Sequence, residues 1–287
     1  MAETQDHDAS IVSIAGVNTS DLYFLAVLSL PTHPTEVTSV IYTLSYAGNA
    51  SSQVVYTVDT WLTRMDRSSG GVFYAVSIDG ELHYSRNGFW HVLDVGVARG
   101  LNSVWAASDN DAFAVGRSGE RARITNGVVQ RIDDSAARNL YTVTGSDRNN
   151  VIAVGDSGVI HWFDGQRWSE LESPTNYNLL TALVRSESEI YIGGARGVLF
   201  RGDGTRWEKL KAPPDLNITS LAWYGDRLYA CTRPVGGIHV LTPSGLELIK
   251  SLDVTNLKAI GDHLFAIGGR LVAFYDGAVW RGGNLEL

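Results

Sequence analysis

The chain alternates short apolar runs with polar or glycine-rich turns over almost its whole length. Residues 140–171 show this best, because LYTVTGSDRNNVIAVGDSGVIHWFDGQRWSEL contains four apolar runs separated by SDRNN, GDSG and DGQ. Short apolar runs between turn residues are typical of β-strands, and no helical period extends beyond a single turn. Residues 101–132 and 180–210 repeat the pattern. We therefore predict a repeated unit of four short antiparallel strands.

From the second copy onward the unit recurs at intervals of 38 to 40 residues. The first strands are expected to begin near Ile11, Trp61, Leu101, Leu140, Leu180, Ile218 and Leu257. Four strands in about 40 residues are the sequence signature of a propeller blade. We predict an all-β fold, a seven-bladed β-propeller of four-stranded antiparallel blades, with the apolar first strands at the axis. Six blades are the alternative, because the first copy is irregular.

That irregularity is an insert at about residues 29–52, which carries two prolines and a polar loop. We predict a polar N-terminal tail at residues 1–9 and a single propeller domain over residues 10–287. The final copy is short, so the way in which the ring closes is not evident; the tail could pair across the seam.

A glycine-containing turn precedes the fourth strand of most copies. Asn-Gly and Asp-Gly favour the type I′ turn that matches the twist of a hairpin. These pairs occur at 87–88, 126–127, 164–165, 203–204 and 276–277. Tryptophans follow four of the turns, which predicts that their rings pack between blades: Trp90, Trp168, Trp207 and Trp280.

The repeat resembles a group of bacterial β-propellers with the pattern V-W-x-x-S-x-x-D-x-x-A-V-G, followed by G-x-I and D-G-x-x-W. VWAASDNDAFAVG at 104–116 and GVIHWFDGQRW at 158–168 carry the resemblance. The group overlaps with photosystem-assembly-factor-like and Asp-box-like propellers. The resemblance implies the fold. It does not imply one function, because propellers serve as enzymes, lectins and scaffolds alike.

Composition excludes several classes of function. The formal net charge of −8 argues against a protein that binds duplex nucleic acid, which needs a basic face. The longest early apolar run, residues 22–30, is too short to span a membrane as a helix. The N-terminus lacks the pattern of an export signal, and the single cysteine, Cys231, allows no internal disulfide. We expect a cytoplasmic protein.

No motif indicates catalysis, a metal or a cofactor. GDSG at 155–158 is a repeat turn, and DGQRW lacks the spacing of a sialidase Asp-box. His83, His161 and His239 recur every 78 residues on third strands of alternate blades, too far apart to share a metal ion. We predict that they are buried polar groups bonded to neighbouring strands. No catalytic or metal-binding residues and no cofactor are therefore predicted.

The turns between second and third strands should gather on one face of the ring. Arginine there could bind a carboxylate, a phosphate or an acidic partner, although pairing with the acids of a neighbouring blade or plain solvation is the more common role of charged loop residues. Aromatic side chains in the first strands could anchor a partner at the axis or rim. The candidate partner-binding residues are Arg117, Asp156, Arg196, Arg233, Arg270, Trp105 and Trp223.

We therefore predict a non-enzymatic, protein-binding propeller, an interaction scaffold or an inhibitor. One concrete form is an immunity protein that neutralises a cognate bacterial toxin, since an acidic protein is steered toward a basic toxin or complex subunit. A carbohydrate is the alternative partner, bound by a lectin that uses Trp168 and Trp207 with Arg167 and Arg206. A glycoside hydrolase is the third and weakest hypothesis.

Overall fold

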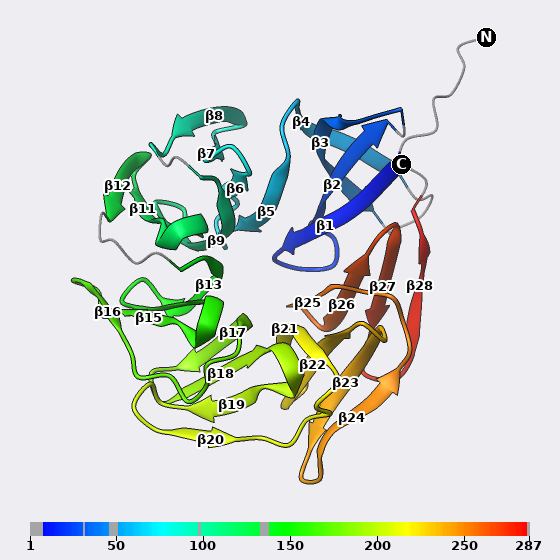
Figure 1. Ribbon diagram of the computed structural model, residues 1–287. Helices are drawn as coiled ribbons and strands as arrows, with labels where there is room; N and C mark the ends of the chain where they lie inside the picture. Colours follow the sequence, from blue (N-terminus) through cyan, green and yellow to red (C-terminus); the bar gives the residue numbers. More distant parts are fainter. Residues whose placement is uncertain (1–7, 31, 46–50, 97–98, 133–137, 286–287) are drawn as a thin grey trace.

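The computed structural model describes residues 8–30, 32–45, 51–96, 99–132 and 138–285. Seven four-stranded antiparallel sheets stand around a central axis, as Figure 1 shows. Each sheet consists of four strands that are consecutive in the chain. The prediction of seven blades is confirmed, and the six-bladed alternative is wrong. No helix in the described part of the chain is long and apolar enough to cross a membrane.

The first three blades occupy the N-terminal half of the chain. Blade 1 contains β1 (Asp8–Gly16), β2 (Leu22–Leu30), β3 (His33–Ser45) and β4 (Ser51–Val58). Blade 2 contains β5 (Leu62–Arg67), β6 (Phe73–Ser77), β7 (Glu81–Arg86) and β8 (Phe89–Asp94). Blade 3 contains β9 (Leu101–Ser108), β10 (Asp111–Gly116), the 3-10 turn η1 (Arg117–Gly119), β11 (Arg121–Thr125) and β12 (Val128–Ile132).

The other four blades follow in order. Blade 4 contains β13 (Leu140–Asp147), β14 (Asn150–Gly155), η2 (Asp156–Gly158), β15 (Ile160–Phe163) and β16 (Trp168–Glu170). Blade 5 contains β17 (Leu179–Ser186), β18 (Glu189–Gly194), η3 (Ala195–Gly197), β19 (Leu199–Gly202) and β20 (Trp207–Lys209). Blade 6 contains β21 (Asn217–Tyr224), β22 (Arg227–Arg233), β23 (Gly237–Thr242) and β24 (Gly245–Lys250). Blade 7 contains β25 (Asn256–Ile260), β26 (His263–Gly268), β27 (Leu271–Tyr275) and β28 (Trp280–Asn284).

Blade 1 differs from the others in the length of its strands. The expected irregular insert at 29–52 is largely regular strand, because β2 ends at Leu30 and β3 continues for thirteen residues. The β2–β3 hairpin remains paired as far as Leu30 and His33. The stretch TEVTSVIYTL is rich in β-branched residues, which suit a long strand. The two prolines obscured this pattern in the sequence.

Only some of the hairpin turns have the type I′ conformation that the sequence predicted. The Asn-Gly pairs have positive φ at both residues, 53° and 81° at Asn87 and Gly88, as type I′ requires. The Asp-Gly pairs do not, because only the glycine has positive φ, as at Gly165 (94°). There the Asp164 carboxylate accepts hydrogen bonds from the N–H groups of Gln166 and Arg167, both at 2.9 Å. The aspartate side chain thus supports a different turn from the one predicted.

The hydrophobic core is divided into seven clusters, one between each pair of neighbouring blades. The recurrent tryptophans join these clusters, as predicted; Trp90, for example, stacks on Tyr56 of blade 1 at 4.1 Å between ring centroids. The three recurrent histidines are buried on third strands, each opposite an alanine of the second strand: His83, His161 and His239. His83 Nδ1 lies 2.9 Å from the Tyr56 hydroxyl of the preceding blade. In this fold, side chains are therefore buried mainly by contact with the neighbouring blade.

The ring closes by contact between blades 1 and 7, without a strand shared between them among the described residues. The Ile11 N–H donates to the Gly269 carbonyl at 2.7 Å. Phe24 and Phe265 lie in the cluster between the two blades. Asp8, which the prediction placed in the tail, pairs with Ser29 of the same blade. Residues 1–7, the rest of the predicted tail, lie outside the described part of the chain.

Candidate functional site

The propeller has two faces that differ in their loops. We call the face that carries the turn between the second and third strands of each blade, together with the connections between blades, the upper face. The opposite, lower face carries the turns between first and second strands. The predicted candidate residues divide between these two faces.

Arg117 and Asp156 begin the equivalent turns η1 and η2 on the upper face. Arg117 is exposed and lines a hollow of about 440 Å³ together with Arg99. Asp156 is instead anchored, since it accepts hydrogen bonds from Asn139 Nδ2 at 2.8 Å and from the Tyr141 hydroxyl. Burial and the Asp156 carboxylate raise the pKa of Tyr141 to about 12. Asp156 therefore has a structural partner, whereas Arg117 faces solvent.

Arg196 does not occupy the same position as Arg117 within its turn. Ala195 begins η3, and Arg196 takes the left-handed backbone position with φ of 56°, which Ser118 and Ser157 take in the preceding blades. The guanidinium of Arg196 lies 5.5 Å from the centre of the Tyr177 ring. The two arginines share a face but not a register, because GRSGE and GARGV align by their second glycine.

The last two candidates of the upper face, Arg233 and Arg270, are also involved in contacts of their own blades. Arg233 ends β22 and forms an ion pair of 2.8 Å with the exposed Asp253. The Arg270 carbonyl accepts a hydrogen bond from the Leu285 N–H at 2.9 Å. Neither contact shows a shared binding site. The binding of an anion or an acidic partner by these arginines therefore stays a prediction.

The two tryptophan candidates lie toward the lower face. Trp105 pairs with Phe113 in the sheet and lines the channel along the axis. Trp223 lies beneath the Arg185 guanidinium of blade 5, which is 3.7 Å from the centre of the indole ring. The axial position was expected for one or both rings; the structure places Trp105 at the axis and Trp223 between blades 5 and 6.

A repeated asparagine, to which the sequence analysis assigned no role, joins neighbouring blades on the upper face. Its side-chain Oδ1 accepts a hydrogen bond from the left-handed residue of the preceding blade's turn, at 2.9 to 3.1 Å. The three copies are Asn139, Asn178 and Asn217. Their spacing of 39 residues was the signal that could have revealed them.

A large hollow lies on the upper face between the β2–β3 hairpin of blade 1 and blade 2. It has a volume of about 1000 Å³. We call it the hairpin cleft; its apolar lining consists of Leu28, Leu30, Val37, Val40, Trp61 and Ile78. The long strands of blade 1 supply one wall of this cleft. The predicted insert therefore contributes directly to this concave surface.

Trp61 is held at the floor of this cleft by contacts to both of its neighbours. The Ser39 hydroxyl donates to the Thr60 carbonyl at 2.6 Å and accepts from the Leu62 N–H at 2.9 Å. The Trp61 carbonyl accepts from the Ile78 N–H at 2.9 Å. Even so, Trp61 remains 42% exposed. A rigid backbone thus presents a large apolar ring to solvent.

The charged groups that line the hairpin cleft are all acidic: Glu36, Asp59 and Asp79. The Thr38 hydroxyl donates to Asp59 at 2.9 Å, and the Thr60 hydroxyl donates to Asp79 at 2.7 Å. These neutral donors orient the carboxylates without cancelling their charge. The cleft is therefore an apolar surface with an acidic rim.

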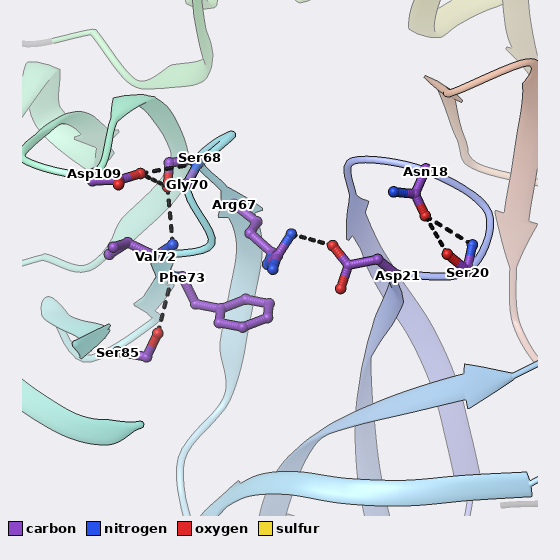
Figure 2. Close-up of polar contacts among 10 residues, drawn as sticks. All are labelled: Asn18, Ser20, Asp21, Arg67, Ser68, Gly70, Val72, Phe73, Ser85 and Asp109. Atoms are coloured by element: carbon purple, nitrogen blue, oxygen red, sulfur yellow. Dashed lines mark hydrogen bonds and ion pairs between the residues drawn. The ribbon is translucent and has the colours of Figure 1, made fainter. Parts of the chain in front are cut away.

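On the lower face, turns of successive blades are tied together, as Figure 2 shows. Arg67 of blade 2 forms an ion pair of 2.5 Å with Asp21 of blade 1, and its guanidinium lies 5.2 Å from the centre of the Phe73 ring. Asp109 of blade 3 accepts hydrogen bonds from the Ser68 hydroxyl at 2.6 Å and from the Gly70 N–H at 3.1 Å. Polar contacts between the turns of neighbouring blades therefore stabilise this face.

Comparison with known proteins places the chain by fold alone. No family model and no curated protein matches it. Among solved structures, the WD40 propeller domain of Doa1 has a TM-score of 0.76 at 11% identity and covers 95% of each chain. Virginiamycin B lyase from Staphylococcus aureus has a TM-score of 0.72 at 14% identity, over 92% of this chain and 94% of the lyase. YCF48 bound to D1 peptide has a TM-score of 0.60 at 15% identity, over 78% and 80%.

These similarities define a class of protein, the β-propellers, and within that class a seven-bladed ring. The resemblance to photosystem-assembly-factor-like propellers agrees with the match to YCF48 at the level of fold. Identities of 11 to 15% do not extend to function.

Proposed function

We propose that this chain is a non-enzymatic, protein-binding propeller whose partner docks in the hairpin cleft. The observation that carries the proposal is Trp61, an exposed aromatic ring on a backbone fixed by Ser39 and Ile78. Aromatic side chains in apolar pockets are the usual energetic centres of protein interfaces, and a fixed ring loses little entropy on binding. The predicted face of arginines is not required for this binding mode.

The partner that fits this cleft is basic. Glu36, Asp59 and Asp79 supply negative charge at the rim, and the whole chain has 31 acidic against 23 basic side chains. Complementary charge accelerates association and weakens wrong pairings. An immunity protein that neutralises a basic toxin in the cytoplasm is the specific form of this proposal; a scaffold for a basic complex subunit is the general form.

The enzymatic and carbohydrate-binding alternatives receive less support. Virginiamycin B lyase shows that a propeller of this shape can be an enzyme. Within the described residues of this chain, however, no histidine lines the axial channel or the hairpin cleft. For a lectin, Trp168 and Trp207 would have to present their faces to a sugar, yet both rings pack in the clusters between blades. The hairpin cleft therefore favours protein binding.

The test is purification of the tagged chain from its native host as wild type, as Trp61→Ala and as Phe89→Ala. Phe89 is the matched control, an aromatic residue that is 71% exposed and lies on the outer strand of blade 2, outside the cleft. We expect one basic partner in stoichiometric amount with the wild type and with Phe89→Ala, and its loss with Trp61→Ala.

The affinity of each variant for the purified partner then shows whether Trp61 itself contributes to binding. Trp61→Ala should weaken binding by about 2 kcal/mol or more, roughly thirtyfold in Kd, and raising the salt concentration should weaken wild-type binding. A monomeric wild type without a stoichiometric partner would count against the proposal. Equal affinity of the two variants would move the interface away from the cleft.

A further inference from the structure

The first strands of all seven blades surround a channel of about 360 Å³ along the axis. Several of the residues that line it carry hydroxyl groups, and some of these hydroxyls hold neighbouring blades together. The Thr142 hydroxyl donates to the Leu180 carbonyl at 2.8 Å, and the Thr219 hydroxyl donates to the Thr255 carbonyl at 3.1 Å. The channel is therefore a polar cavity with fixed walls, separate from the hairpin cleft.

Four charged side chains line this channel: Arg64, Asp66, Arg67 and Lys258. Asp66 of blade 2 forms an ion pair of 2.5 Å with Lys258 of blade 7 through Oδ1, and its Oδ2 accepts the Ala106 N–H of blade 3 at 2.9 Å. Arg67 is paired with Asp21. Three of the four charges thus have partners within the protein.

Arg64 is the exception. None of the described residues forms a hydrogen bond or an ion pair with its guanidinium, and the nearby Asp66 already uses both oxygens. Its side chain keeps partial contact with the channel, but protein surrounds it, and this burial lowers the pKa of Arg64 despite the attraction of Asp66. An arginine stays charged at neutral pH under almost any conditions, so the half-buried guanidinium presents to the channel a charge that has no partner among the described residues.

We propose that the axial channel binds a small oxyanion, held by the guanidinium of Arg64. The planar fork of donors on arginine suits two oxygens of one carboxylate or phosphate group. The ion pair of Asp66 with Lys258 leaves Arg64 as the uncompensated positive charge, so a single anion neutralises the channel. The volume of about 360 Å³ admits a compact metabolite-sized ligand and excludes a folded partner.

The alternative, water alone in the channel, would leave the charge of Arg64 uncompensated. A bound anion and water alone predict different effects of anions on the stability of a variant that lacks the Arg64 charge. If an anion binds, wild type gains stability with anion concentration by mass action, and a variant without the charge does not. If only water fills the channel, anions act on both chains alike.

The test measures Tm at constant ionic strength, with chloride replaced stepwise by acetate, succinate or phosphate. The chains are wild type, Arg64→Met, Arg64→Lys as a variant that keeps the charge, and Arg99→Met as the control. Arg99 is an exposed arginine of the upper face, outside the channel. We expect a rise that grows with the logarithm of anion concentration and reaches about 5 °C in wild type and in Arg99→Met near a hundred times Kd.

Arg64→Lys should respond more weakly, and Arg64→Met not at all. In chloride alone, Arg64→Met should melt at or above the temperature of wild type, because it removes a half-buried charge without a protein partner; near a hundred times Kd of the anion this order should reverse. Response to the carboxylates only, or to phosphate only, identifies the ligand chemistry. The same response in Arg64→Met and wild type, or none in wild type with all three anions, would overturn the proposal. Neither outcome affects partner binding in the hairpin cleft.

Discussion

Single residues decide how neighbouring blades are joined. Asn178 binds the N–H of Ser157, a residue with φ of 52°, and Asn217 does the same for Arg196. A left-handed backbone is unfavourable for residues other than glycine, so this hydrogen bond offsets part of the cost of the turn. The same side chains that repeat along the sequence therefore act between blades rather than within them.

Burial between blades also changes the pKa values of the buried histidines. Burial, together with the positive charge of Arg121, lowers the pKa of His161 to about 4, from an ordinary value of 6.5. The unfolded chain therefore binds a proton at a higher pH than the folded chain. Stability is fully present above pH 6.5 and is lost as the pH falls from 6.5 toward about 4.

We expect His161→Gln to remove up to about 3 kcal/mol of this pH dependence, measured as the difference in unfolding free energy between pH 6.5 and 4. Chemical denaturation at a series of pH values checks it. His239→Gln should remove a further part, because burial also lowers the pKa of His239. A slope that is unchanged in both variants would contradict the assignment.

At the scale of elements, the β2–β3 hairpin distinguishes blade 1 from its copies. Ser39, fully buried in β3, links this hairpin to the connection that carries Trp61. Because that connection also bonds to Ile78 of blade 2, the wall and the floor of the hairpin cleft are coupled. The local backbone of Trp61 therefore depends on a residue that does not reach the cleft surface.

Ser39→Ala should lower the unfolding free energy by about 1 to 3 kcal/mol, since it leaves the Leu62 N–H without its acceptor. It should also weaken partner binding through a less ordered Trp61, although Ser39 makes no contact there. Denaturant titration and the affinity for the reconstituted partner measure the two effects. Loss of stability with unchanged affinity would show that the position of Trp61 does not depend on this serine.

At the scale of the whole molecule, the ring is seven similar interfaces in sequence. Every blade is made from consecutive strands, and blades 1 and 7 meet through a cluster like the other six. The first and last strands of the chain, β1 and β28, belong to these two neighbouring blades, as Figure 1 shows. Among the described residues, no strand of one blade is supplied by a distant part of the chain, so all seven boundaries between blades are of the same kind.

A circular permutant cut between Pro214 and Asp215, in the connection of blades 5 and 6, should fold with a Tm within about 5 °C of the native order. A short Gly/Ser linker joins the original ends. A second permutant, cut between β22 and β23, places the halves of blade 6 at opposite ends of the chain and should melt lower. Thermal melts of both compare the two cuts; equal losses would indicate that the original boundary contributes specifically to stability.

The sequence by itself determined the repeat and with it the class of fold. Six of the seven first strands begin within one residue of the predicted position, because apolar runs and turn residues are local signals read directly from the chain. The same repetition correctly predicted that the tryptophans pack between blades and that the three histidines are buried, since side chains that recur at one position of the repeat meet similar packing.

The two proposed binding surfaces emerge only in the tertiary structure. The hairpin cleft joins residues of two blades, and the channel joins residues as distant as Asp66 and Lys258, so no local pattern predicts either. The candidate arginines lie in or beside turns of different blades on one face, and a binding site shared by them stays a prediction. Sequence spacing measures distance along the chain, whereas a binding site depends on distance in space.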